Sequence, residues 1–176
     1  MKTKKKHLMA MALMAATIGM VGCTEKENNN TDTPDTSDEV LYAFHYQDRT
    51  LEPEQTVYFY PTADDVQENW ATTTDIFIEN LTDANLQSVL KVEKVSGNAA
   101  ADTVLFCFGE QCMSAICPWT SGALTVTPGV NDNLPLHVQY SPNSVEGTTV
   151  YRITVGKGSS LVGKQVMLLS LSGQAQ

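Results

Sequence analysis

From residue 40 onwards, much of the chain alternates between apolar and polar side chains, as in strands that bury one face and expose the other. Residues 134–140, LPLHVQY, follow this pattern, and residues 149–155, TVYRITV, repeat it. The segment between them, SPNSVEG, is rich in turn-forming residues. We therefore predict that the two strands pair as a β-hairpin.

Other segments with the same strand-like pattern follow at regular spacing. Only residues 62–70 suggest a helix, because Thr62 and Asp65 have the spacing of a capping box. About nine short strands joined by polar turns predict a single all-β domain, an antiparallel β-sandwich, and periodicity does not distinguish it from a closed barrel. The remaining predicted strands are residues 40–47, 56–60, 74–81, 88–95, 103–108, 123–127 and 165–171.

The amino terminus has the features of an export signal. Four lysines precede an apolar run at residues 8–21, which is too short for a membrane span and suits a secretory signal peptide. The run leads into Met20-Val21-Gly22-Cys23, which resembles the lipobox of bacterial lipoproteins, with Met20 in place of the usual leucine. The resemblance implies cleavage before Cys23 and lipid on its sulfur; an ordinary signal peptide is the alternative.

The segment that follows Cys23 contains no large apolar side chain in residues 24–39. Such a composition predicts a flexible tether, because the segment buries too little surface to offset its ordering entropy. The predicted organisation is a signal peptide at 1–22, a lipidated tether at 23–39 and a folded domain at 40–176. Acidic residues after Cys23 resemble the surface-export signals of Bacteroides-type lipoproteins, so we expect an outer-membrane lipoprotein exposed at the cell surface.

Cleavage would make the protein strongly acidic. The whole chain has 11 basic and 20 acidic residues, and residues 1–22 hold four of the basic ones and no acidic one, which leaves a net charge of −13. Such a charge repels phosphates, so we expect no nucleic-acid partner and no membrane attachment beyond the lipid.

Four segments occur along the chain in the order IFIENLTDANLQSVLKVEKV, FCFGEQC, LTVTPG and HVQYSPNSVEGTTVYRITV. This order resembles the immunoglobulin-like domains of envelope lipoproteins and secreted proteins of Bacteroidota. The resemblance covers roughly residues 74–156 and implies an immunoglobulin-like sandwich, closed by a hairpin and serving as an interaction or spacer module. It also implies a disulfide between Cys107 and Cys112.

Three cysteines, Cys107, Cys112 and Cys117, lie close together in the sequence. Redox chemistry is disfavoured, because the first lies in a strand pattern and no Lys or Arg occurs in residues 95–151 to stabilise a thiolate. A zinc site would need His137 as fourth ligand, but that residue falls on the polar face of its strand and the spacing is unlike a zinc knuckle. We therefore predict no metal and no cofactor.

Export instead favours a structural disulfide, since neighbouring thiols oxidise outside the cytoplasm. The Cys112–Cys117 spacing equals the Cys107–Cys112 spacing, so spacing alone does not select the pair. With the resemblance favouring Cys107–Cys112, we expect Cys117 either to be buried beneath Pro118 and Trp119 or to pair between chains.

Few residues offer material for catalysis. His45 and His137 are the only histidines after Cys23, and no Gly-x-Ser-x-Gly motif occurs. Asp64, Asp65 and Glu68 lack the alternating spacing of a calcium loop, which favours a solvated acidic turn. We expect no catalytic residue.

Several aromatic residues fall near predicted loops. Tyr58, Tyr60 and Trp70 lie around the amino-terminal strands, and Trp119 follows Pro118. Packing is the favoured role of such side chains, although exposed rings can stack on sugars. We retain the loop at Trp119 as a candidate ligand contact.

Together these features predict a lipid-anchored envelope protein that acts as a non-enzymatic interaction or accessory module and binds a protein or glycan. The alternative is a stalk or assembly subunit that polymerises by strand exchange. An enzyme is the least favoured class, since it would need a buried acid pair or a reactive Cys117.

Overall fold

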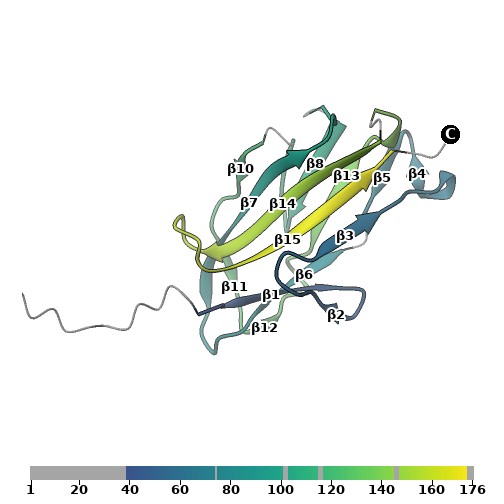
Figure 1. Ribbon diagram of the computed structural model, residues 1–176. Coiled ribbons are helices and arrows are strands. Elements are labelled where there is room, and N and C mark those ends of the chain that lie inside the picture. The colour runs from purple at the N-terminus through teal and green to yellow at the C-terminus, as the bar shows by residue number, and fades with distance from the viewer. Residues whose placement is uncertain (1–38, 74, 101–102, 115–116, 145–146, 174–176) are drawn as a thin grey trace, which may run out of the picture. The chain divides into compact units, whose positions relative to one another are not determined.

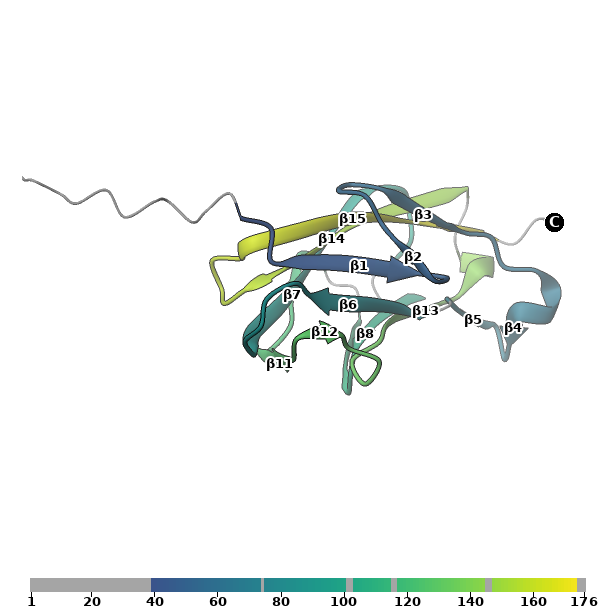
Figure 2. The same ribbon diagram turned by 90° about the horizontal axis from the view of Figure 1, so that it is seen from below.

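The computed structural model describes residues 39–73, 75–100, 103–114, 117–144 and 147–173. Two β-sheets pack face to face in this part of the chain, which makes a sandwich rather than a closed barrel (Figures 1 and 2). Short 3₁₀ turns lie at Ala63–Asp65 and Pro142–Ser144. None of the described residues forms an apolar helix of membrane-spanning length.

The first sheet, sheet A, contains a path of six strands with three more strands attached. β12 pairs with β6, and β8 pairs with both β13 and β9. All of its strand pairs are antiparallel. The path runs β2 (Arg49–Thr50), β1 (Tyr42–Tyr46), β6 (Ile76–Asn80), β13 (Leu136–Tyr140), β5 (Trp70–Thr72) and β4 (Val66–Gln67), and the attached strands are β12 (Gly129–Val130), β8 (Val104–Phe108) and β9 (Gln111–Ser114).

The second sheet, sheet B, contains the longest strands. Its pairs are antiparallel except for β3, which runs parallel to β15 at one edge, in contrast to the all-antiparallel prediction. β11 (Leu124–Val126) pairs with β7 beside the main path. That path runs β10 (Trp119–Thr120), β7 (Leu86–Ser96), β14 (Thr148–Lys157), β15 (Val162–Ser172) and β3 (Thr56–Phe59).

The core lies between the sheets, where alternate side chains of each strand meet. Phe106 of sheet A packs edge-on against Tyr151 of sheet B, with 4.9 Å between ring centroids. The hydroxyl of Tyr140 donates to the backbone oxygen of Ser172 at 2.8 Å, from one sheet to the other. Each buried side-chain nitrogen and oxygen among the described residues has a hydrogen-bond partner, so the core is both apolar and satisfied.

All nine predicted strands are present, with boundaries that differ by a few residues. The prediction missed strands of two to four residues, in which alternation is too short to recognise. The missed strands are β2, β4, β5, β9, β10 and β12.

The predicted hairpin between residues 134–140 and 149–155 is wrong. β13 belongs to sheet A, whereas β14 belongs to sheet B and forms its hairpin with β15. β13 and β14 each bury one face in the same core, but from opposite sheets. The seven residues between them, 141–147, are enough for the chain to cross from one sheet to the other. Periodicity reveals which side chains point inward, but it carries no information about which sheet they point from.

Residues 62–70, which suggested a helix, form a single 3₁₀ turn and a hairpin instead, although the capping contact exists. The Thr62 N–H and hydroxyl donate to the Asp65 carboxylate at 2.7 and 2.8 Å, around a single 3₁₀ turn. Glu68 and Asn69 then adopt φ values of 50° and 71°, which form the two-residue turn of the β4–β5 hairpin. The capping pair therefore closes a turn that leads into a strand.

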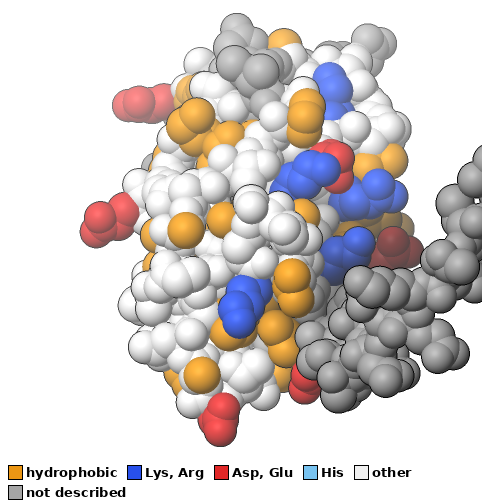
Figure 3. All heavy atoms as spheres, turned by 90° about the vertical axis from the view of Figure 1, so that its left-hand side faces the viewer, with side chains coloured by type: hydrophobic (Ala, Val, Ile, Leu, Met, Phe, Trp, Pro, Cys, Tyr) orange, Lys and Arg blue, Asp and Glu red, His pale blue; other side chains and the backbone are white. Residues whose placement is uncertain are grey.

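The charges of the domain are distributed unevenly between the sheets. All described Lys and Arg residues except Arg49 lie on strands of sheet B, whereas Glu93 is the only described acidic residue on those strands. Figure 3 shows Lys and Arg side chains gathered over one side of the end it faces. Sheet B is therefore basic, although the net charge of the protein is negative.

Ile153, fully buried in the central strand β14, tests the core. Ile153→Ala is expected to lower the free energy of unfolding by about 2–5 kcal/mol, because it leaves a cavity between the sheets. Urea denaturation followed by intrinsic fluorescence measures this loss. The matched control, Val95→Ala at an exposed position of β7, should change stability by less than about 0.5 kcal/mol. Equal losses in both variants would contradict this packing.

Candidate functional site

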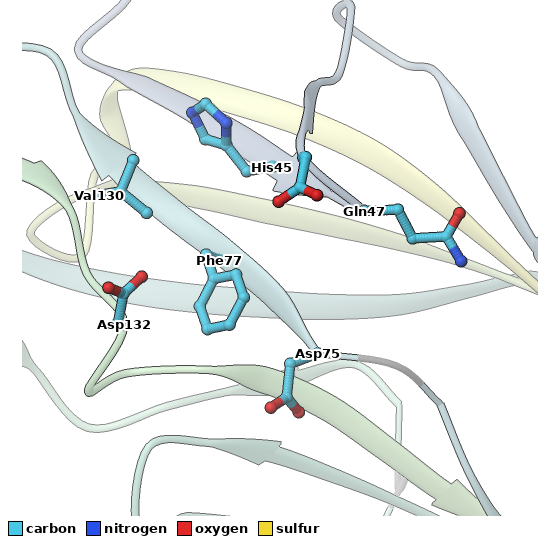
Figure 4. A pocket seen from close by; sticks show the side chains of 7 residues that line it. His45, Gln47, Asp75, Phe77, Val130 and Asp132 are labelled. Atoms are coloured by element: carbon cyan, nitrogen blue, oxygen red, sulfur yellow. The ribbon is translucent and has the colours of Figure 1, made fainter.

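The outer face of sheet A carries a hollow of about 590 Å³, shown in Figure 4. An aromatic ring, Phe77, stands in its middle, with carboxylates around it. The chain segments that meet here are far apart in sequence, and they come from β1, β6, β12 and the turns beside them. The lining residues are His45, Gln47, Asp48, Asp75, Phe77, Val130 and Asp132.

Strand alternation places Phe77 in the hollow. Ile76 and Ile78 point into the core, so Phe77 between them must point outward. His45 of β1 lies directly opposite Phe77 in the antiparallel pairing. Asp48 reaches the rim through the two-residue β1–β2 turn, where its φ is 61°.

The far wall of the hollow depends on one buried amide, Asn131. Its side-chain nitrogen donates to the backbone oxygens of Thr127 and Gly129 at 2.8 and 2.9 Å. Its side-chain oxygen accepts hydrogen bonds from the Thr127 N–H and hydroxyl at 3.0 and 2.9 Å. These bonds hold the loop on which the neighbouring residues, Val130 and Asp132, face the hollow.

Negative charge dominates the rim. Asp48 and Asp132 are exposed and form no ion pair with any described residue, while Asp75 lies 3.5 Å from His137 Nδ1. His45 Nε2 contacts the Glu79 carboxylate at 2.7 Å. The hollow therefore combines an apolar floor with carboxylates that remain available to a cationic group.

A row of side chains beside the hollow superficially resembles a catalytic triad. Thr50 Oγ1 lies 3.4 Å from His45 Nδ1. The other ring nitrogen of His45, Nε2, contacts the Glu79 carboxylate. Thr50 and His45 are cross-strand partners, so strand pairing alone explains their contact. The distance exceeds the 2.6–3.2 Å or so expected of a nucleophile and its base, and we assign no catalysis to this row.

Among residues 39–173, leaving out the short gaps, no three His, Cys, Asp or Glu side chains come together as metal ligands. His137 lies on the outward side of β13, as its sequence pattern predicts. In the strand pairing it lies directly opposite Cys107.

A second hollow, of about 700 Å³, gathers residues that the sequence singled out separately. Asp64, Asp65, Glu68 and Trp70 all line it, around the β4–β5 hairpin. The two hydrogen bonds from Thr62 lower the pKa of Asp65 and occupy one of its oxygens. The Asp65 carboxylate therefore stabilises the 3₁₀ turn through these two hydrogen bonds.

The remaining aromatic candidates separate into exposed and packed rings. Tyr58 and Tyr60 are 58 % and 65 % exposed and stack with 6.1 Å between their centroids. Trp119 lies on the short strand β10 rather than in a loop, and it packs against the core in a half-buried position. Ligand contact by Trp119 stays a prediction.

Cys107 and Cys112 form the disulfide that the resemblance implies, and they are directly opposed in the β8–β9 hairpin. Cys117 is free within this chain and half-buried against the core. Burial raises the pKa of the Cys117 thiol, and a backbone hydrogen bond with Lys94 offsets part of that rise. The predicted lipidation site, Cys23, lies outside the described residues.

The first hollow itself was missed by the sequence analysis. One signal was present, because Phe77 is a large aromatic residue on the outward side of an alternating strand. The carboxylates around it carried no such signal, since they come from turns whose mutual approach depends on the fold.

No protein-family model matches the chain, and no curated protein sequence matches it. Solved structures do share its fold. The N-terminal domain of PorA superposes with a TM-score of 0.53 and 19 % identity, covering 76 % of this chain and 99 % of that domain. The fold is an immunoglobulin-like β-sandwich. At this level of identity the likeness carries the fold alone.

Two further structures show weaker similarity. The ASH/PapD-like domain of human CEP192 (PapD-like domain 7) has a TM-score of 0.41 and 9 % identity, covering 91 % of this chain and 100 % of that domain. A FixG-related protein from Vibrio parahaemolyticus has a TM-score of 0.39 and 15 % identity, covering 60 % of this chain and 80 % of that one.

Asn131 provides a test of how the hollow is held. Asn131→Ala is expected to lower the free energy of unfolding by about 2–3 kcal/mol, because the Thr127 and Gly129 backbone groups lose their partner. Chemical denaturation measures the loss. The neighbouring exposed residue supplies the control, and Asn133→Ala should leave stability within about 0.5 kcal/mol of the unsubstituted protein. A similar effect of both substitutions would argue against the anchoring role.

The cysteines make a separate prediction. Peptide mapping without reductant should recover Cys107 joined to Cys112, and Cys117 should react slowly with alkylating agents until the protein is denatured. Replacing both bridged cysteines by alanine should cost about 2 kcal/mol, the value expected for so short a loop. Rapid labelling of Cys117 in the native protein would contradict its half-buried position.

Proposed function

We propose that this protein is a lipid-anchored protein of the cell envelope that acts as a non-enzymatic binding module, with the hollow around Phe77 as its ligand contact. The lipid on Cys23 and the location at the outer membrane, exposed to the exterior, rest on the leader sequence. The immunoglobulin-like fold is consistent with an interaction role and does not select one.

The hollow's combination of charge and apolar surface carries the proposal. A lysine or arginine side chain would lay its aliphatic stem along Phe77 and Val130 and direct its cation toward Asp48, Asp75 and Asp132. The favoured partner is therefore a protein that presents a basic side chain. A glycan partner would draw instead on the stacked rings of Tyr58 and Tyr60.

Assembly by strand exchange is a second candidate, and the edge of sheet B favours it. β3 has only four residues, and its pairing with β15 is the single parallel strand pair within the described part of the chain. A strand from another copy could add to or replace such a short edge strand. This alternative predicts ladders of oligomers in SDS gels of unheated samples.

Site-specific photocrosslinking on intact cells would test the binding role. A benzophenone amino acid at exposed Val130, on the rim of the hollow, should capture a discrete partner. Asp75→Lys with Asp132→Lys should reduce capture by at least about tenfold, because like charges then face the incoming cation. Mass spectrometry of the adducts identifies the partner.

Two controls match the changes in position and charge. The same crosslinker at exposed Val95, on sheet B, should not capture that partner. Glu52→Lys with Asp83→Lys makes an equal charge change at exposed positions away from the hollow and should preserve capture. If positions 130 and 95 yield the same abundant envelope proteins, the hollow is not a specific site.

A further inference from the structure

The β14–β15 hairpin end of sheet B presents cations that lack ionic partners. Lys157 closes β14, and Lys164 lies near the start of β15; both side chains are exposed. Neither these lysines nor Arg152 forms an ion pair with any residue that the structure describes, whereas Lys91 is neutralised by Glu93 at 2.8 Å. In an otherwise acidic domain, this end would attract an anionic surface.

The two lysines flank an exposed apolar side chain. Val162 pairs with Lys157 across the hairpin and is 42 % exposed, and Lys164 follows on the same outward side of β15. An arrangement of cations around an exposed aliphatic group matches the boundary between lipid headgroups and acyl chains.

The described chain begins at this same end (Figure 1). The Leu41 N–H donates to the Gly163 backbone oxygen at 2.9 Å, and a Cβ on Gly163 would overlap the Leu41 side chain. Glu39, Leu41 and Lys157 line one shallow hollow of about 290 Å³. The first described residues, 39–41, therefore contact the β14–β15 hairpin that carries the two lysines.

The distance to the anchor follows from the sequence. Cys23 precedes Glu39 by 16 residues. The composition of residues 24–39 predicts a flexible tether, for which the expected average end-to-end distance is about 20 Å. A lipid on Cys23 would therefore keep the β14–β15 end of the domain within reach of the membrane, and charge would act once that end comes within about 8–10 Å of the surface.

We propose that the β14–β15 end of sheet B docks on an anionic lipid surface, with Lys157 and Lys164 contacting lipid phosphates and Val162 meeting the headgroup boundary. Docking would orient the tethered domain and direct the far end of sheet A away from the membrane. The inference rests on the lipid anchor of the proposed function. Figure 3 faces this end and shows most of the visible Lys and Arg side chains to the right, with one nearer the middle.

Hydrogen–deuterium exchange on vesicles tests the docking. The full-length lipoprotein is purified from membranes and reconstituted into vesicles of phosphatidylcholine, or of phosphatidylcholine with about one third phosphatidylglycerol. Backbone amides of the turn at residues 158–161 should exchange more slowly on the anionic vesicles only. The extra protection should disappear in about 0.5 M salt, which screens the attraction.

A pair of variants with equal net charge isolates the surface. Lys157→Gln with Lys164→Gln should lower the extra protection at least about fivefold. Arg49→Glu alters the net charge by the same amount on sheet A and should leave the protection unchanged. Equal protection on neutral and anionic vesicles, or unchanged protection in the lysine variant, would overturn the docking. Protection that grows with protein concentration without vesicles would also overturn it, in favour of self-association.

Lipidation is read separately, so that failure of the anchor and failure of the docking can be told apart. Mass spectrometry of the amino-terminal peptide reports lipid on Cys23. A lipidated protein whose turn stays unprotected on anionic vesicles would disprove docking while leaving the anchor intact. An unlipidated protein that is still protected there would support docking and remove the anchor from the proposed function.

Discussion

The contact between the two sheets is the constraint on which the rest of the structure depends. Each sheet has one apolar face, and burying these faces against each other determines which side chains point outward. Tyrosines strengthen the contact by bonding across it, as Tyr42 does to the Ser88 hydroxyl at 2.7 Å and Tyr140 to the Ser172 backbone oxygen. Burial raises the pKa of both phenols, which therefore remain neutral at physiological pH.

The outward faces acquire their character as a consequence of that packing. With the Ile76 and Ile78 side chains committed to the core, Phe77 must face solvent, where the pairing of β1 with β6 brings His45 beside it. The turn of Asp48 and the loop held by Asn131 then supply carboxylates on either side. The candidate site is therefore a by-product of strand order, supported by one buried amide.

Separation of charge between the sheets gives the domain two different surfaces. The net charge suggests uniform repulsion from anionic surfaces, yet the basic residues are concentrated on sheet B and most acidic residues lie on sheet A or in loops. Because screening limits electrostatic interactions to about 8–10 Å at physiological salt, local charge governs contact more than the total does. An acidic hollow and a basic hairpin end can thus serve different partners on one small domain.

Several features could be predicted from the sequence because they depend on neighbouring residues alone. Alternation in residues 134–140 identified the strand that the structure has at Leu136–Tyr140 and its inward side chains. The capping contact of Thr62 with Asp65 formed at the predicted spacing. The Cys107–Cys112 pairing followed from a resemblance and lies within a single hairpin. Interactions between residues close in sequence leave a readable pattern.

The tertiary structure alone decided the features that require distant segments to meet. The strands β13 and β14 look like hairpin partners in sequence but belong to opposite sheets, because a period of two identifies a buried face and not the layer to which it belongs. Phe77 and Asp132 become neighbours only through the pairing of β12 with β6. Pairing partners are selected by the free energy of the whole core, which no single stretch of sequence contains.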